Sequence, residues 1–182
     1  AMKPIVVIPT YNERQNIIPL IHQLFFLGIP ELQIIVIDDN SPDGTAEAVE
    51  SMRADHPVHL VKRLHKLGLG SAYIAGFKKA LALGADVIFE MDADFSHDPK
   101  DVPRLLATLA DYDFVIGSRR VSNGKIIGWN WRRHLTSFGA NSFARLGLGL
   151  KSKDVTAGFR CFKRAVLETI QFETIKSNGY AF

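Results

Sequence analysis

Two carboxylates, Asp92 and Asp94, flank Ala93 shortly after the apolar run 87–89. Carboxylate oxygens are hard ligands that suit Mg²⁺ or Mn²⁺, and such ions complete their coordination with waters and substrate phosphates. The pair therefore predicts a divalent-cation site that binds phosphate. The alternative is a solvated turn, with Asp98 capping the helix that follows.

A second acidic pair, Asp38 and Asp39, follows the apolar run 34–37. Neighbouring side chains on an extended chain point to opposite faces. We therefore expect one carboxylate to contact a ligand and the other to anchor the loop. The alternative is that both begin a turn before Ser41-Pro42, and it competes more strongly for Asp38 than for Asp39.

Aromatic and imidazole groups lie beside these carboxylates in the sequence. A nucleotide base or ribose could lie on Tyr11, with Glu13 accepting a hydrogen bond. Alternatively, Tyr11 packs in the loop, and Thr10 and Glu13 form a capping box at a helix start. His97 could touch the metal or a phosphate, or could cap the next helix.

Arginines follow the fifth apolar run and a tryptophan-containing loop. Arg119 comes after the run 114–116, and Arg133 comes after Trp129 and Trp131. Arginines at strand ends suit an anionic substrate, which they bind through paired hydrogen bonds. The tryptophans could rest on a membrane surface or cover the core, and the alternative for the arginines is a solvated basic face.

The elements that must position these groups are short strands alternating with amphipathic helices. Apolar β-branched runs predict five strands, at 5–8, 34–37, 58–61, 87–89 and 114–116. Helices are predicted after Thr10, after Ser41-Pro42, over 68–83 and over 98–109. The alternation predicts an α/β fold with a parallel sheet and helices on both faces, in which ligands bind at the carboxyl ends of the strands.

The pattern is weaker after residue 120. There we expect a helix over 133–148, a strand over 159–162 and a helix over 164–170. We expect residues 1–182 to form a single catalytic domain that ends before its natural C-terminus.

Composition excludes several classes of protein. Of the 182 residues, 47% are hydrophobic and 23% charged, which excludes a disordered chain, and the net charge of +3 gives no reason to expect nucleic acid. The single Cys161 excludes an internal disulfide or a multi-cysteine zinc site. No apolar run approaches the ~18 residues of a membrane span. The glycine loop 66–70 lacks the third glycine of a dinucleotide motif, because position 73 is Tyr.

The motifs, in this order, resemble family 2 glycosyltransferases of GT-A fold. The matching segments are PTYNE at 9–13, VIDDNSPDGT at 36–45, MDADFSH at 91–97 and GSR at 117–119. The closer resemblance is to dolichol- or polyprenol-phosphate mannose synthases. That resemblance rests on KLGLGSAY at 66–73, WNWRR at 129–133 and TAGFR at 156–160.

The resemblance implies a role for each matching residue. The nucleoside would be held by Pro9, Tyr11, Glu13, Ile37 and Asp39. The diphosphate and a Mg²⁺ or Mn²⁺ ion would be held by Asp92, Ala93 and Asp94, with Arg119 also on the donor and Ser96 as a third metal ligand. Some members carry Gln where this chain has Ser96, and a hydroxyl is a poorer ligand. The acceptor phosphate would be held by Arg119, Arg133 and Ser137, and the catalytic residues would be Asp94, Arg119 and Arg133.

The resemblance also implies a reaction and its partners. The expected enzyme is an inverting hexosyltransferase that moves mannose from GDP-mannose to a dolichyl or polyprenyl monophosphate. We expect a cytoplasmic protein that associates peripherally with the inner face of the membrane, with no nucleic acid partner. Alternatives are the same fold using UDP-glucose or another nucleotide sugar, a nucleotidyltransferase, or a non-catalytic nucleotide-binding module.

Overall fold

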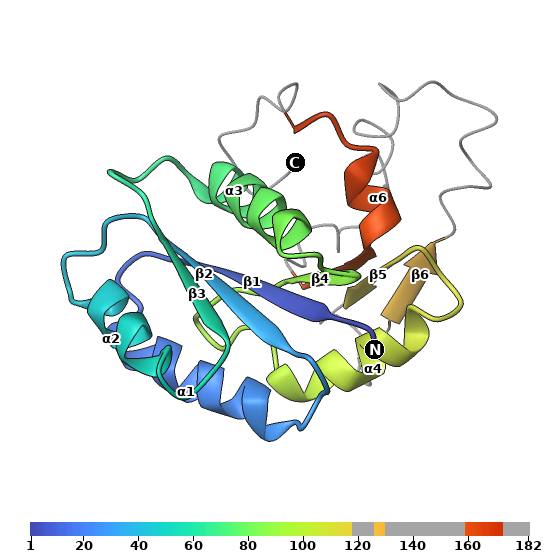
Figure 1. Cartoon of the computed structure of the whole chain (residues 1–182), viewed down its shortest axis with the longest axis horizontal. Coiled ribbons are helices and arrows are strands. Elements are labelled where there is room, and N and C mark those ends of the chain that lie inside the picture. Colours follow the sequence, from blue (N-terminus) through green and yellow to red (C-terminus); the bar gives the residue numbers. More distant parts are fainter. Residues whose placement is uncertain (118–125, 130–158, 173–182) are drawn as a thin grey trace.

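A seven-stranded sheet forms the centre of the chain, which a computed structural model describes over residues 1–117, 126–129 and 159–172 (Figure 1). The strands are β1 (Pro4–Thr10), β2 (Gln33–Asp38), β3 (Val58–Lys62), β4 (Val87–Glu90), β5 (Phe114–Gly117), β6 (Ile126–Trp129) and β7 (Arg160–Lys163). The helices are α1 (Arg14–Phe26), α2 (Thr45–Met52), α3 (Leu69–Ala82), the short 3₁₀ helix η1 (Pro99–Asp101), α4 (Val102–Thr108) and α6 (Arg164–Glu168). None of these helices is both long and apolar enough to cross a bilayer.

The strand order is β3-β2-β1-β4-β7-β5-β6. β3, β2, β1 and β4 are parallel, as the alternation predicts. β5 does not pair with β4 directly, because β7 lies between them and is antiparallel to both. β6 is antiparallel to β5. The sheet is therefore mainly parallel, with an antiparallel insertion next to β4.

Helices cover both faces of the sheet, as predicted. α1, α2 and α4 lie on one face, while α3 and α6 lie on the other (Figure 1). The β-branched runs are buried on both sides because their side chains alternate: Val6 joins the core beneath α1, and Val7 joins the core beneath α3. The carboxyl ends of β1, β2 and β4 meet at one edge of the sheet, where the acidic residues follow.

The predicted starts of the first two helices, a capping box of Thr10 with Glu13 and an N-cap at Ser41 before Pro42, are wrong. Thr10 belongs to β1 and donates its hydroxyl hydrogen to Asp38 Oδ1 at 2.8 Å, so it caps no helix. α1 begins only after Glu13, whose side chain makes no capping bond. Ser41-Pro42 also precedes no helix, because α2 begins at Thr45. A hydrogen bond to Asp38 takes the Thr10 hydroxyl away from the start of α1, and a longer loop separates Ser41 from the start of α2.

The later predictions fare better. Asp98 accepts a hydrogen bond from the backbone N–H of Lys100 at 3.0 Å and so caps η1, as predicted. α3, β7 and α6 occur within a few residues of their predicted positions. The predicted helix over 133–148 lies outside the described residues.

Candidate active site

The acidic edge of the sheet faces α3. Side-chain alternation along β1 and β2 puts Pro9 and Ile37 on the α3 face, where they are paired neighbours in the parallel ladder. The same alternation along β4 and beyond puts Ile88, Glu90 and Asp92 on that face. Pro9, Ile37 and Asp92, three of the residues predicted for nucleoside and diphosphate, therefore share one side of the sheet, at the carboxyl ends of adjacent strands.

The two carboxylates after β2 point to opposite faces, as alternation predicts, and each is held by protein groups. Asp38 is buried and accepts hydrogen bonds from Thr10 Oγ1, from the backbone N–H of Ser41 at 2.9 Å and from the Ser41 hydroxyl at 2.6 Å. Asp38 therefore anchors the loop between β2 and α2. Asp39 points to the opposite face, toward the segment between β3 and α3.

Asp39 forms a buried ion pair with Arg63. The guanidinium binds both carboxylate oxygens, with Nη2 to Oδ2 at 2.7 Å, and both side chains are less than one-tenth exposed. Arg63 also donates to Ser71 Oγ at 2.7 Å and to the carbonyl of Gly68 at 3.1 Å. Asp39 thus holds the segment between β3 and α3 against the strand edge. Sequence reasoning missed Arg63, and only its place directly after β3 pointed to it.

Tyr11 and Glu13 lie on different sides of the loop after β1. The Tyr11 ring is 41% exposed, and the Lys66 ammonium lies 4.2 Å from its centroid. Glu13 instead turns toward α2, where its backbone N–H donates to Thr45 Oγ1 at 3.0 Å. Its carboxylate accepts from Asn16 Nδ2 at 2.9 Å. The structure therefore brings Tyr11 beside the α3-face loop and gives Glu13 contacts on the α1–α2 side.

Asp92 is held from two directions. Tyr73, on α3, donates its hydroxyl hydrogen to Asp92 Oδ1 at 2.9 Å. The backbone N–H of Asp92 donates to His97 Nδ1 at 3.0 Å, and His97 Nε2 lies 3.8 Å from Asp92 Oδ2. The His97 ring is buried and stacks on Phe159. His97 therefore braces the turn after β4, while Asp98 caps η1.

Asp94 lies in the same turn and is exposed. Its Oδ1 accepts the backbone N–H of Ser96 at 2.9 Å, and Phe95 between them has a positive φ of 58°. Across the described residues, no three His, Cys, Asp or Glu side chains are placed to hold a metal ion by themselves. The donor set of Asp92 and Asp94 fits a hard cation such as Mg²⁺ or Mn²⁺, provided that substrate phosphate and water complete the coordination. The Ser96 hydroxyl as a third ligand stays a prediction.

A buried ion pair that sequence reasoning missed lies directly behind these carboxylates. Glu90 is 2% exposed and sits 3.5 Å from Arg160 Nη1 on the neighbouring β7. Burial raises the pKa of Glu90 to about 7, while Arg160 acts to lower it and Asp92 to raise it. The sequence signal for this ion pair was Glu90 itself, a charged residue beside the apolar run before Asp92, because a buried charge needs a partner.

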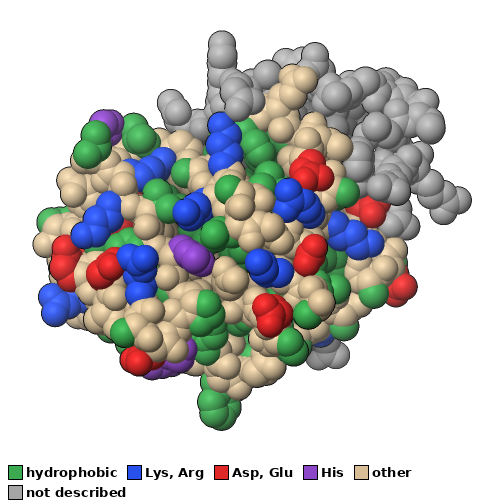
Figure 2. Space-filling model, in the orientation of Figure 1, with side chains coloured by type: hydrophobic (Ala, Val, Ile, Leu, Met, Phe, Trp, Pro, Cys, Tyr) green, Lys and Arg blue, Asp and Glu red, His purple; other side chains and the backbone are tan. Residues whose placement is uncertain are grey.

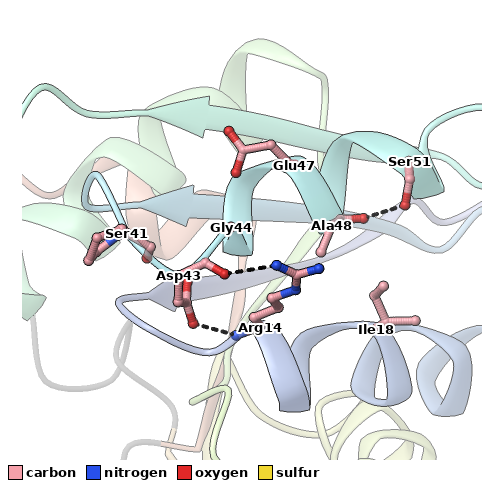
Figure 3. A pocket seen from close by; sticks show the side chains of 9 residues that line it. Arg14, Ile18, Ser41, Asp43, Gly44, Glu47, Ala48 and Ser51 are labelled. Carbon is pink, nitrogen blue, oxygen red and sulfur yellow. Dashed lines mark hydrogen bonds between the residues drawn. The ribbon is translucent and has the colours of Figure 1, made fainter.

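A separate hollow opens between α1 and α2, lined by a different set of residues (Figure 3). Its volume is about 760 Å³. Arg14 points toward Asp43. The Arg14 Nη1 donates to the carbonyl oxygen of Asp43 at 3.2 Å, and the Arg14 backbone N–H donates to the Asp43 carboxylate at 3.1 Å. Elsewhere on the surface, Figure 2 shows Lys and Arg interspersed with Asp and Glu over the face drawn. The predicted ligand residues lie at the acidic edge and do not line this hollow.

Several predicted site residues lie outside the part of the chain that the structure describes. They are Arg119, Arg133 and Ser137. The structure gathers the rest at or next to one edge: Pro9, Tyr11, Ile37, Asp39, Asp92, Ala93, Asp94 and Ser96, with Glu13 at the border toward α2. Their roles in binding stay predictions, which this placement supports.

Comparisons with known proteins extend over almost the whole chain. Undecaprenyl-phosphate mannosyltransferase of Micrococcus luteus is 43% identical over 182 residues, covering 100% of this chain and 74% of the relative. Polyprenol monophosphomannose synthase of Mycolicibacterium smegmatis is 45% identical over 183 residues, covering 99% and 69%. Dolichol-phosphate mannosyltransferase of Pyrococcus furiosus is 37% identical over 179 residues, and the chain spans 50% of that protein's length.

Solved structures with the same fold are more distant in sequence. The mannosyltransferase PcManGT from Pyrobaculum calidifontis, in complex with GDP-Man and Mn²⁺, has a TM-score of 0.63 at 21% identity, covering 91% of this chain and 46% of that one. S. aureus TarS 1–349 has a TM-score of 0.64 at 20% identity, covering 92% and 48%. These likenesses confirm the expected GT-A fold. The model of the family described as glycosyl transferase family 2 matches residues 5–171, and the chain belongs to that family.

Proposed function

We propose that the protein transfers mannose from GDP-mannose to a polyprenyl monophosphate, with inversion at the anomeric carbon. The observation that carries the proposal is the 43% and 45% identity with two relatives named for mannose transfer to polyprenyl phosphates. Since a polyprenyl acceptor lies in a bilayer, we also propose that the protein works in the cytoplasm, at the inner face of the membrane.

The geometry of the acidic edge supports this proposal. Pro9 and Tyr11 provide an apolar and aromatic surface for the nucleoside beside Asp39, and the buried Ile37 pairs with Pro9 in the sheet. Asp92 and Asp94 follow the neighbouring strand β4, where we expect the diphosphate of the same donor to bind. A Mg²⁺ or Mn²⁺ ion bound by these two carboxylates would neutralise the negative charge that develops on the leaving diphosphate.

The proposed reaction makes one bond and breaks one bond. An oxygen of the acceptor phosphate attacks the anomeric carbon of mannose, and the bond from that carbon to the donor diphosphate breaks, which releases GDP. The acceptor phosphate is already ionised near neutral pH, so the chain needs no strong general base to activate it. Arg119 and Arg133 would bind the acceptor phosphate through paired hydrogen bonds.

The test is transfer of labelled mannose to a polyprenyl monophosphate in detergent, with Mn²⁺ and with EDTA. Asp94→Asn should reduce transfer at least about 100-fold, because it removes the charge that binds the cation. Asp101→Asn is the matched control, since Asp101 pairs with Arg104 on the exposed surface. We expect this variant to keep wild-type activity.

Other outcomes change the proposal in stated ways. Transfer from UDP-glucose but not from GDP-mannose would keep the acceptor and mechanism and replace the donor. Full activity of Asp94→Asn would contradict the cation site. Absence of transfer from every nucleotide sugar tried would refute the proposed reaction.

A further inference from the structure

The contacts that hold Asp92 come from buried side chains outside the acidic turn. Tyr73 is 2% exposed, and its ring packs near Phe77 on α3, with centroids 6.1 Å apart. Its hydroxyl reaches Asp92 Oδ1 at 2.9 Å. A tyrosine buried on a helix usually packs by its ring, and here its polar end is aimed at a candidate metal ligand.

The Tyr73 hydroxyl is the donor in its contact with Asp92. A phenol group has one hydrogen to donate, and an ionised carboxylate only accepts, so the hydroxyl fixes Asp92 Oδ1 at 2.9 Å.

His97 holds the same residue through its backbone. Its Nδ1 accepts the Asp92 N–H at 3.0 Å, so in the neutral ring the proton is on Nε2. That atom lies 3.8 Å from Asp92 Oδ2. The ring is fixed by burial and by stacking on Phe159, with centroids 5.2 Å apart and planes at 14°.

We propose that Tyr73 and His97 are positioning residues that fix the Asp92 carboxylate in the orientation that binds the divalent cation. The inference rests on the proposed function, because it assumes that Asp92 is a ligand. A carboxylate that is already oriented loses little rotational freedom when the cation binds. Partners of this kind, which orient a metal ligand, typically change metal affinity by 10- to 100-fold when they are mutated.

The sharpest variant is Tyr73→Phe, because it removes one hydroxyl and keeps the ring packing. The matched control is Tyr112→Phe, since Tyr112 packs against the core on the opposite face of the sheet. For His97 the pair is His97→Asn and His97→Leu. Asn keeps an acceptor near the position of Nδ1, whereas Leu keeps bulk and removes the acceptor.

The measurement is Mn²⁺ affinity in the presence of GDP, by electron paramagnetic resonance of free Mn²⁺, with GDP binding in EDTA measured alongside. We expect Tyr73→Phe to bind Mn²⁺ at least about 10-fold more weakly, with GDP binding in EDTA and the thermal midpoint unchanged. Tyr112→Phe should bind Mn²⁺ as the wild type does. His97→Asn should retain more Mn²⁺ affinity than His97→Leu.

Each result decides between the two proposals. Equal Mn²⁺ affinity in wild type and Tyr73→Phe overturns the positioning role and leaves the proposed function intact. Weaker binding of GDP in EDTA by Tyr73→Phe also overturns it, because a general structural effect would then explain the loss. A wild-type protein that binds no Mn²⁺ with GDP refutes both the positioning role and the cation site.

Discussion

Replacing Glu90 with Gln should change how the stability of the protein depends on pH. Glu90 is 2% exposed, and its pKa is raised from 4.5 to about 7, chiefly by burial. Between these two values the folded protein holds a proton that the unfolded chain has lost. Stability from this group is therefore fully present below about pH 4.5 and is lost as the pH rises to about 7.

The size of the effect follows from the two pKa values. Each pKa unit corresponds to about 1.4 kcal/mol, so the difference between 4.5 and about 7 gives about 3.5 kcal/mol over the full range. Most of this change falls between about pH 5 and about pH 8. Gln has nearly the same shape and no charge, so the Glu90→Gln variant should lack this part of the pH dependence.

The assay is urea unfolding of wild type and Glu90→Gln at about pH 5 and at about pH 8. EDTA is present so that no divalent cation alters the charge balance. We expect wild type to lose about 2–3 kcal/mol relative to the variant as the pH rises from about 5 to about 8. The control is Glu168→Gln, because Glu168 is exposed and pairs with Arg164. A difference between wild type and Glu90→Gln that does not vary with pH would refute the reasoning.

Two further substitutions test the packing around the acidic edge. Gly76→Ala should cost about 1–3 kcal/mol in urea unfolding, because the new Cβ would lie 2.2 Å from Val7 Cγ1, and adding Val7→Ala should recover part of the loss. A neutral Gly76→Ala would show that α3 can move away from β1. Arg63→Met should cost about 3 kcal/mol, because it leaves the buried Asp39 unpaired, and should speed proteolysis between β3 and α3. Arg104→Met, at an exposed ion pair, should cost under about 1 kcal/mol, and an equal loss in both variants would contradict the role given to Asp39.

The sequence predicted the strands well because their signal is local. Runs such as 34–37 are β-branched and apolar throughout, which is typical of strands buried on both faces. Once the strands were placed, the rule for parallel sheets put Asp38, Asp39, Asp92 and Asp94 at one edge. The alternation of neighbouring side chains also predicted that Asp38 and Asp39 point to opposite faces, whereas the ligand contact expected of one of them stays a prediction.

The position of β7 could not be predicted, because its pairing with β4 joins segments far apart in the chain. A strand was predicted over 159–162, but the local sequence does not predict which strands it pairs with. The capping predictions failed for a related reason. Thr10 satisfies the local pattern of a cap, yet the hydroxyl of Thr10 binds Asp38 on another strand. The helix starts therefore depended on tertiary contacts.

The pairing of β7 with β4 also governs the order in which the sheet is completed. Residues 160–163 are synthesised well after 87–90, so on the nascent chain β4 has one open side, and that side carries Glu90 without its cation. An inward charge at an open strand edge discourages pairing with a foreign strand. When β7 arrives, only the register that puts Arg160 opposite Glu90 compensates the charge, and a slip by one residue would bring Cys161 or Phe159 there instead. The Glu90 carboxylate therefore disfavours pairing of β4 with a foreign strand before β7 is added, and then favours the native register of β7.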